Sequence, residues 1–179
     1  GIDLHANQSA LELSQKYPGK IFAAVGIHPN FGQLWTADIL PTLREQARKP
    51  GVKAIGEIGL DYYRQHTPYA QQQTMFKEQL SMAAELELPV IIHNRDATQD
   101  LMKILSEWYQ ELIESGNPLK NRPGVLHSYS ADLKTAQEAI KMNFFIGISG
   151  PVTFKNAPDR KFVTQNLSLD SLLLETDAP

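Results

Sequence analysis

The chain has 179 residues, which is enough to bury a sizeable hydrophobic core in one domain. Its formal net charge of -3 excludes a surface that is basic all over, so a polyanionic ligand would have to be held by a metal or by a few local cations. The absence of cysteine excludes disulfides and thiolate chemistry. No apolar run approaches the roughly 18 residues of a membrane span and no signal peptide is recognisable, so we expect a cytoplasmic protein without a membrane partner.

Helical periodicity and short apolar runs alternate along the chain. Thr36 is the expected N-cap of the second helix, Pro50-Gly51 its end, and Gly116 the C′ residue of the fourth helix. The periodicity predicts helices at residues 7–16, 36–49, 69–86, 98–115, 132–142 and 158–165. Runs that are apolar on both faces predict strands at residues 21–25, 52–56, 90–92, 125–126, 144–148 and 172–174, with the tail of one more before Asp3.

This alternation is typical of a parallel sheet covered by helices, and it predicts an α/β fold of the TIM-type (β/α)8 barrel class. A closed eight-stranded barrel takes about 250 residues, so we expect residues 1–179 to form a single, partial barrel domain that lacks the first strand or strands and the C-terminal segment. The unpaired strand edges of such a domain should favour association, although no obligatory protein partner is evident.

Five of the apolar runs end on, or directly before, residues that bind metals or transfer protons. These residues are His28, Glu57, His93, His127 and Asp177. Because parallel barrels place their chemistry at the C-terminal ends of the strands, we expect these side chains to meet at one mouth. Three imidazoles and two carboxylates make a plausible ligand set for zinc, manganese, iron or magnesium.

Each of these residues also has a structural alternative. Glu57 could form a buried ion pair, because a carboxylate inside an apolar strand must be paired or metal-bound. His93 and His127 could be hydrogen-bonded core histidines, and Asp177 could cap a turn before Pro179. We interpret all four as metal ligands, with Glu57 and Asp177 also acting in catalysis by activating and orienting a water molecule. Asp177 is preferred to Glu175, which lies two residues deeper on the same face.

Two further residues are candidates for substrate binding. His28 is expected to contact a substrate phosphate or to cap the turn at Pro29. Arg95 follows His93 on the same side of the chain and is expected to hold a phosphate bidentately or to pair with Asp61 or Asp96. Among the aromatic and imidazole residues nearby, Tyr62, Tyr63 and Tyr129 could stack on bases or simply pack, and His5 and His66 are expected at the surface.

Six segments, taken in order, closely resemble the TatD-type metal-dependent deoxyribonuclease family of amidohydrolase-like barrels. They are Val25-Gly26-Ile27-His28-Pro29, Ile55-Gly56-Glu57-Ile58-Gly59-Leu60-Asp61-Tyr62, His93-Asn94-Arg95, His127-Ser128-Tyr129-Ser130, Gly147-Ile148-Ser149-Gly150 with Thr153-Phe154, and Leu174-Glu175-Thr176-Asp177-Ala178-Pro179. Each segment alone is weakly informative, whereas the ordered set covers nearly the whole chain and is highly specific.

The resemblance implies a mouth with two divalent metal ions, which would be zinc, magnesium or manganese. Glu57 would bridge the ions, His93 and His127 would hold one, and Asp177 would help to hold the other. The family uses a His-x-His pair at the end of its first strand for the second ion, and this sequence has no such pair. The Glu57-His93-His127 set remains complete.

The implied function is hydrolysis of phosphodiester bonds in DNA, or in RNA, with nucleic acid as the only partner. Two alternatives remain open at this stage. A related barrel could hydrolyse a small amide, lactone or phosphotriester, although such barrels often carry a modified lysine where this chain has Glu57. The chain could also be a non-catalytic remnant, which the missing His-x-His pair favours.

Overall fold

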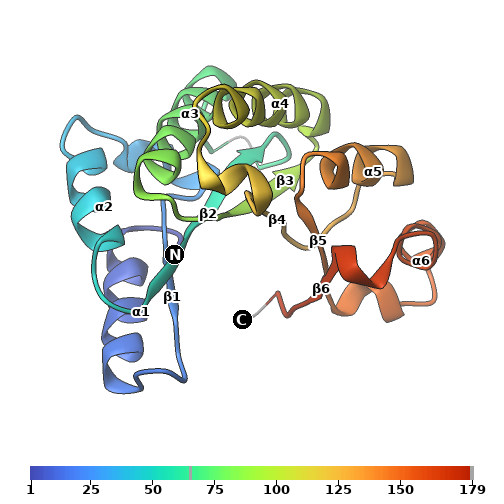
Figure 1. Cartoon of the computed structure of the whole chain (residues 1–179), viewed down its shortest axis with the longest axis horizontal. Coiled ribbons are helices and arrows are strands. Elements are labelled where there is room, and N and C mark those ends of the chain that lie inside the picture. The colour runs from blue at the N-terminus through green and yellow to red at the C-terminus, as the bar shows by residue number, and fades with distance from the viewer. Residues whose placement is uncertain (65, 178–179) are drawn as a thin grey trace.

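The computed structural model describes residues 1–64 and 66–177 as one layer of parallel strands with helices against it (Figure 1). Six strands pair in the order β1-β2-β3-β4-β5-β6, and every neighbouring pair is parallel. The strands are β1 (Ala23–Val25), β2 (Val52–Asp61), β3 (Val90–Arg95), β4 (Gly124–Leu126), β5 (Phe145–Ile148) and β6 (Leu172–Leu174). The predicted α/β fold with a parallel sheet is confirmed. Within the described residues the sheet does not close, and β1 and β6 are its edges.

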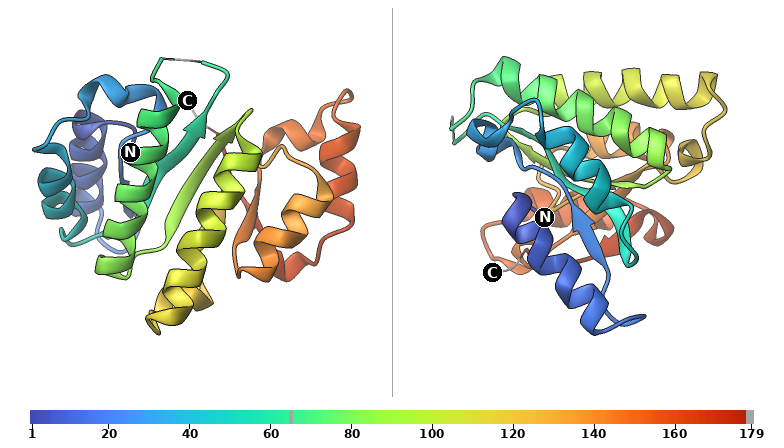
Figure 2. Two further views of the ribbon diagram at one scale, coloured as in Figure 1. Left: turned by 90° about the horizontal axis from the view of Figure 1, so that it is seen from above. Right: turned by 90° about the vertical axis from the view of Figure 1, so that its left-hand side faces the viewer.

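The helices lie on the outer side of the curved sheet. They are α1 (Leu4–Lys16), α2 (Ile39–Ala47), α3 (Tyr69–Leu86), α4 (Thr98–Glu114), α5 (Leu133–Lys141) and α6 (Pro158–Gln165). Short 3-10 turns fill the connections at η1 (Pro29–Leu34), η2 (Pro118–Asn121), η3 (Gly150–Thr153) and η4 (Leu169–Ser171). The two views in Figure 2 show α3 and α4 side by side over β2 and β3.

The core lies between the sheet and these helices. Ile55, Ile58 and Leu60 of β2 are fully buried, as are Phe76 and Leu80 of α3. Burying each such side chain stabilises the fold by roughly 1.5–3 kcal/mol. The apolar packing between α3 and the sheet therefore fixes β2, the strand that carries Glu57 to the mouth.

Helix α4 shows how the local sequence specifies an element. Its buried residues recur at helical spacing and are Leu101, Ile104, Leu105, Trp108 and Leu112. Gly116 follows the C-cap residue with φ +70, a conformation that glycine adopts without the strain of a Cβ atom. The predicted helix and its C′ residue are both confirmed.

Several expected element boundaries are wrong: α1 already begins at Leu4, β1 begins only at Ala23, and three further differences have a clear physical basis. Helix α2 is preceded by Asp38 as its N-cap residue, and Thr36 instead accepts a hydrogen bond from the Ile39 N–H through its backbone oxygen, 3.1 Å away. Strands β2 and β3 continue past residues 56 and 92, because backbone pairing extends through their polar ends to the Asp61 and Arg95 pair.

The third correction concerns the start of the chain. Residues 1–3 form no strand, although the backbone oxygens of Gly1 and Ile2 accept hydrogen bonds from the Glu57 and His28 N–H groups at 2.7 and 3.0 Å. These contacts hold the N-terminal residues against the strand ends that carry the site.

In the described part of the chain, none of the helices is long and apolar enough to cross a membrane.

Candidate metal and active site

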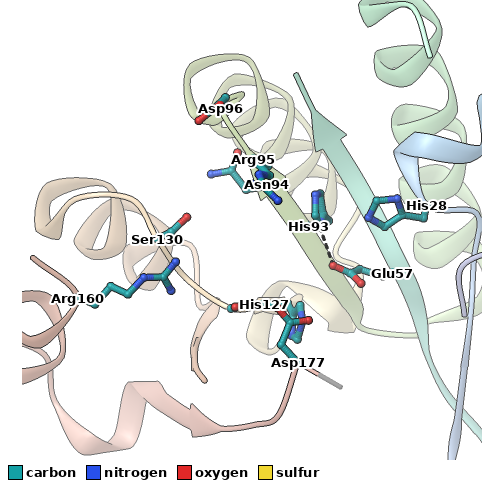
Figure 3. Close-up of a pocket in the computed structure, with 11 residues that line it drawn as sticks. His28, Glu57, His93, Asn94, Arg95, Asp96, His127, Ser130, Arg160 and Asp177 are labelled. Carbon is teal, nitrogen blue, oxygen red and sulfur yellow. Dashed lines mark hydrogen bonds and ion pairs between the residues drawn. The ribbon is translucent and has the colours of Figure 1, made fainter. Parts of the chain in front are cut away.

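The C-terminal ends of the strands surround a cavity of about 460 Å³. Its lining comes from β2 and β3, from the segments that follow β1, β3, β4 and β6, and from α6, as Figure 3 shows. All six residues that the sequence singled out line it, namely His28, Glu57, His93, Arg95, His127 and Asp177. The structure therefore brings the predicted set together, and the role of each residue stays a prediction.

His93 is held between two carboxylates. Its Nδ1 lies 2.8 Å from Glu57 Oε1, and its Nε2 lies 3.1 Å from Asp61 Oδ2. Asp61 is 2 % exposed and also accepts hydrogen bonds from the Asn30 side chain and from the N–H groups of Tyr63 and Arg64. The imidazole is thus oriented from both sides. Sequence reasoning gave Asp61 no role of its own, although its position four residues after Glu57 at the end of the same strand was an available signal.

The backbone of β2 places Glu57 at this point. The pairing of β2 with β3 shifts register between Ile55 and Ile58, which interrupts the regular alternation of faces at Glu57. Two residues later Gly59 pairs with His93 at φ +144, and a Cβ atom there would lie 2.0 Å from the His93 backbone oxygen. The glycine therefore permits the close approach of the two strands on which the Glu57–His93 contact depends.

The charge states of Glu57 and His28 follow from their surroundings. Burial disfavours the Glu57 carboxylate, but the hydrogen bond and charge of His93 outweigh this effect and hold its pKa below the ordinary value. Burial, and then the charge of His93, lowers the pKa of His28 to about 4. At neutral pH the site therefore contains an ionised Glu57 and a neutral His28.

The hydrogen bonding of His28 defines which of its nitrogens faces outward. His28 Nδ1 accepts a hydrogen bond from the Asn30 N–H at 3.1 Å, and its ring meets the His93 ring edge-on with centroids 4.3 Å apart. His28, Glu57 and His93 offer potential ligand atoms that all lie within 4.8 Å of one another. In a neutral imidazole whose Nδ1 accepts, however, Nε2 carries the proton and is a donor. This tautomer favours contact with a substrate oxygen over metal ligation by His28.

A second imidazole, His127, is also paired with two carboxylates. Its Nδ1 lies 2.9 Å from Glu175 Oε2 and its Nε2 lies 3.2 Å from Asp177 Oδ1. The Ser128 N–H donates to the other Glu175 oxygen. The hydrogen bond to Glu175 is the largest cause of a pKa of His127 raised to about 9. Glu175 therefore orients His127 from within the protein, while the Asp177 side chain, 62 % exposed, stands at the rim.

Arg95 reaches the cavity without a carboxylate partner. Its guanidinium lies 4.0 Å from the centroid of the Tyr63 ring. Among the described residues no ion pair joins Arg95 to a carboxylate, so the alternative that it pairs with Asp61 or Asp96 is wrong. Asp61 is already occupied by His93 and three N–H donors, which leaves Arg95 free to face a ligand.

The three tyrosines divide into packed and exposed residues. Tyr62 stacks on Tyr69 with centroids 3.9 Å apart and donates to Asp100 at 2.7 Å. Tyr129 is buried and donates to the Asp132 backbone oxygen at 2.7 Å. Tyr63 alone of the three is largely exposed. His5 and His66 are exposed, as expected.

The donor set fits a divalent metal ion. The imidazoles of His93 and His127 and the carboxylates of Glu57 and Asp177 line one cavity, and these two carboxylates bond to imidazole rather than to a lysine or arginine. Carboxylate and imidazole donors of this kind suit zinc, manganese or magnesium. Arg160 and Ser130 also line the cavity; nothing in the pattern of α6 marked Arg160, and Ser130 appeared only within the family-like segment His127-Ser128-Tyr129-Ser130, without a role of its own.

Comparison with known proteins places this arrangement in a family. A family model described as TatD related DNase matches residues 1–179. An uncharacterized metal-dependent hydrolase of Bacillus subtilis, YabD, is 38% identical over 179 residues, a match that covers 100% of this chain and 66% of that protein. A protein of Erwinia tasmaniensis named 3'-5' ssDNA/RNA exonuclease TatD is 33% identical over 180 residues, with the same coverage of 100% and 66%.

A solved structure agrees with these matches. The crystal structure of the TatD homologue YJJV from Escherichia coli k12 superposes with a TM-score of 0.88 at 31% identity, covering 100% of this chain and 66% of that one. The chain thus spans 66% of the length of these relatives.

Proposed function

Because the chain belongs to the TatD related DNase family, we propose that it acts as a divalent-metal-dependent hydrolase that cleaves phosphodiester bonds of DNA or RNA. The observation that carries the proposal is the convergence of Glu57, His93, His127 and Asp177 on one cavity together with the unpaired guanidinium of Arg95. A relative named as an exonuclease of single-stranded DNA and RNA supports the choice of substrate.

We propose that two divalent ions bind here, and Glu57 would help to hold both of them. His93 and His127 would hold one ion and Asp177 would help to hold the other, and zinc, magnesium or manganese would suit these donors. Bound divalent ions of this kind polarise a phosphoryl oxygen and lower the pKa of a coordinated water.

The chain's own residues supply the remaining steps. Asp177 stands exposed at the rim, where its carboxylate accepts a proton from the attacking water and orients it. His28 presents its Nε2–H and Arg95 its N–H groups to the non-bridging phosphate oxygens, whose charge grows in the transition state. Asp61 and Glu175 keep His93 and His127 in place through the second nitrogen of each ring.

Replacement of Glu57 by Gln tests the proposal, because it keeps the size of the side chain and removes its charge. We expect metal-dependent cleavage of a short oligonucleotide to fall by about 100-fold or more. The matched control is His66→Ala, which removes an exposed histidine outside the cavity and should leave the rate unchanged.

The assay includes lactone, amide and phosphotriester substrates beside the oligonucleotide. Undiminished oligonucleotide cleavage by Glu57→Gln would refute the assigned site. Turnover of a small ester or lactone by the unsubstituted protein, with no action on the oligonucleotide, would refute the nuclease assignment and favour the small-molecule alternative.

A further inference from the structure

The cavity contains two arginines, and the function proposed above uses only one of them. Arg95 and Arg160 are the lysine or arginine residues among its described lining, which also includes the carboxylates of Glu57, Asp96 and Asp177. The whole chain carries a net charge of -3, so no general basic surface attracts a polyanion. Recognition of a phosphate chain therefore depends on cations placed within the cavity itself.

Arg160 is held in the cavity wall by a neutral group. It lies on α6 and is half-buried, and its Nη1 donates to the Tyr129 backbone oxygen at 3.0 Å. Arg160 also lines a small adjoining cavity together with the apolar residues Ile148, Val152 and Val163.

This anchor leaves the charge of Arg160 uncompensated. Within residues 1–64 and 66–177, none of the ion pairs involves Arg160, and the one hydrogen bond of its side chain goes to a carbonyl. A guanidinium has five N–H donors, so most of them remain available to a ligand. Holding such a group in place before the ligand arrives reduces the entropy lost on binding.

The position of Arg160 separates it from the proposed reaction centre. Figure 3 shows Arg160 and Ser130 at one end of the cavity, apart from the cluster of Glu57, His93 and His28. Arg95 belongs to β3, the strand that carries His93. Arg160 belongs to α6, which lies between β5 and the edge strand β6 along the chain. A single phosphate at the reaction centre therefore leaves Arg160 without a ligand.

We propose that Arg160, together with Ser130 of the same cavity lining, binds a second phosphate of the nucleic-acid strand, next to the phosphodiester that is cleaved. The inference rests on the proposed function and names its substrate class more closely: a strand with at least two consecutive phosphates rather than an isolated diester. Two oriented arginines with a spacing set by the fold would recognise the repeat of the sugar-phosphate backbone without reading the bases.

A substrate with one neutralised linkage tests this assignment. A trinucleotide with two phosphodiesters is compared with two versions in which a methylphosphonate replaces one linkage, on either side in turn. We expect the unsubstituted protein to cleave the remaining phosphodiester with kcat/KM lower by about 10-fold or more for one of these versions, because a charge-assisted contact is lost.

Arg160→Ala should remove the preference of the protein for the fully charged trinucleotide over the version with the neutralised linkage. The variant is expected to lose about 10-fold in kcat/KM on the charged trinucleotide and almost nothing on the neutralised one, so that the two values converge. Arg160→Lys keeps the charge and should retain part of the preference. Lys161→Ala, which removes the neighbouring cation outside the cavity, should leave the preference intact.

The outcomes separate this inference from the function on which it rests. Equal losses on both substrates in Arg160→Ala, or no loss on either, would overturn the second phosphate site. Equal rates on charged and neutralised substrates in the unsubstituted protein would overturn it too, while leaving the nuclease assignment standing. Absence of cleavage of every oligonucleotide would overturn both.

Discussion

His93 and His127 share an arrangement in which a carboxylate bonds to each ring nitrogen. For His93 the partners are Glu57 and Asp61, and for His127 they are Glu175 and Asp177. One partner of each pair lies on the inner side and fixes the ring, which sets the direction of the other nitrogen. The two histidines are therefore oriented by the protein before any ion binds.

The contact between Tyr63 and Arg95 gives a prediction at this scale. Tyr63 is 57 % exposed and its ring lies against the Arg95 guanidinium, so it should position Arg95 for the substrate phosphate. Tyr63→Leu removes the aromatic face and should raise KM by about 2- to 5-fold with kcat nearly unchanged, which corresponds to the strength of an exposed cation–π contact.

The matched variant is Tyr63→Phe, which keeps the ring and removes the hydroxyl. Steady-state kinetics on an oligonucleotide should show KM restored close to that of the unsubstituted protein. If Tyr63→Phe and Tyr63→Leu raise KM alike, the ring face has no part in placing Arg95.

At the scale of elements, the ends of strands position the site residues, and capping residues fix where helices begin. The register shift in β2 turns Glu57 toward the mouth, and Gly59 lets β2 approach β3 closely enough for Glu57 to reach His93. On the far side of the sheet, helix α5 begins at an N-cap, Asp132, whose side chain accepts the Thr135 N–H at 2.8 Å.

The Asp132 cap predicts a dependence of stability on pH. The hydrogen bonds from Thr135 hold the pKa of Asp132 below its ordinary value in the folded state. The unfolded state therefore takes up a proton first, so the stability from the ionised cap is fully present above about pH 4 and is lost as the pH falls through the lower folded pKa. We expect Asp132→Ala to lower the free energy of unfolding by about 1 kcal/mol at pH 7.

Asp132→Asn is the control, because asparagine also caps helices but does not ionise in this range. Urea denaturation between pH 7 and pH 3 should show the advantage of aspartate over asparagine shrinking toward the acid end. An advantage that grows as the pH falls would contradict the assigned direction of the pKa shift.

At the scale of the molecule, a curved parallel sheet gathers side chains from five strand ends around one cavity, as Figures 1 and 3 show. The overall charge of -3 and the carboxylates of the cavity disfavour binding of a polyanion. Such binding would therefore require cations within the cavity. Divalent ions would neutralise the carboxylates, and the two arginines would attract the phosphate chain.

Binding of a divalent ion should therefore stabilise the folded protein. An ion present at about 100 times its dissociation constant adds about 2.7 kcal/mol, which raises the melting temperature of a chain of this size by about 5 to 10 °C. Scanning calorimetry with Mn²⁺, and with Zn²⁺ or Mg²⁺ in separate samples, measures this shift relative to protein treated with a chelator.

The shift should depend on Glu57 and not on surface histidines. Glu57→Gln is expected to lose most of the metal-induced rise, whereas His66→Ala should keep it. A rise of equal size in both variants would place the ion outside the cavity.

Much of this arrangement was accessible from the sequence. Helix α4 follows from its apolar spacing and from Gly116, and His28, Glu57, His93, His127 and Asp177 were recognisable as polar residues at the ends of apolar runs. Local periodicity specifies which face of an element is buried and where a strand ends, and a parallel sheet then brings those ends to one edge. The extensions of β2 and β3 escaped prediction because backbone pairing between strands, not side-chain pattern, sustains their polar ends.

Only the tertiary structure decided the partner of each side chain. Arg95 lies on Tyr63 rather than on an aspartate, Glu175 bonds to His127, and Arg160 reaches Tyr129 across 31 residues of sequence. Such pairings depend on how distant segments pack and on which neighbour is already engaged, and neither is encoded in the local pattern of residue types. The sequence by itself therefore determined which kinds of side chain gather at the mouth, and the packed fold determined which of them contact one another.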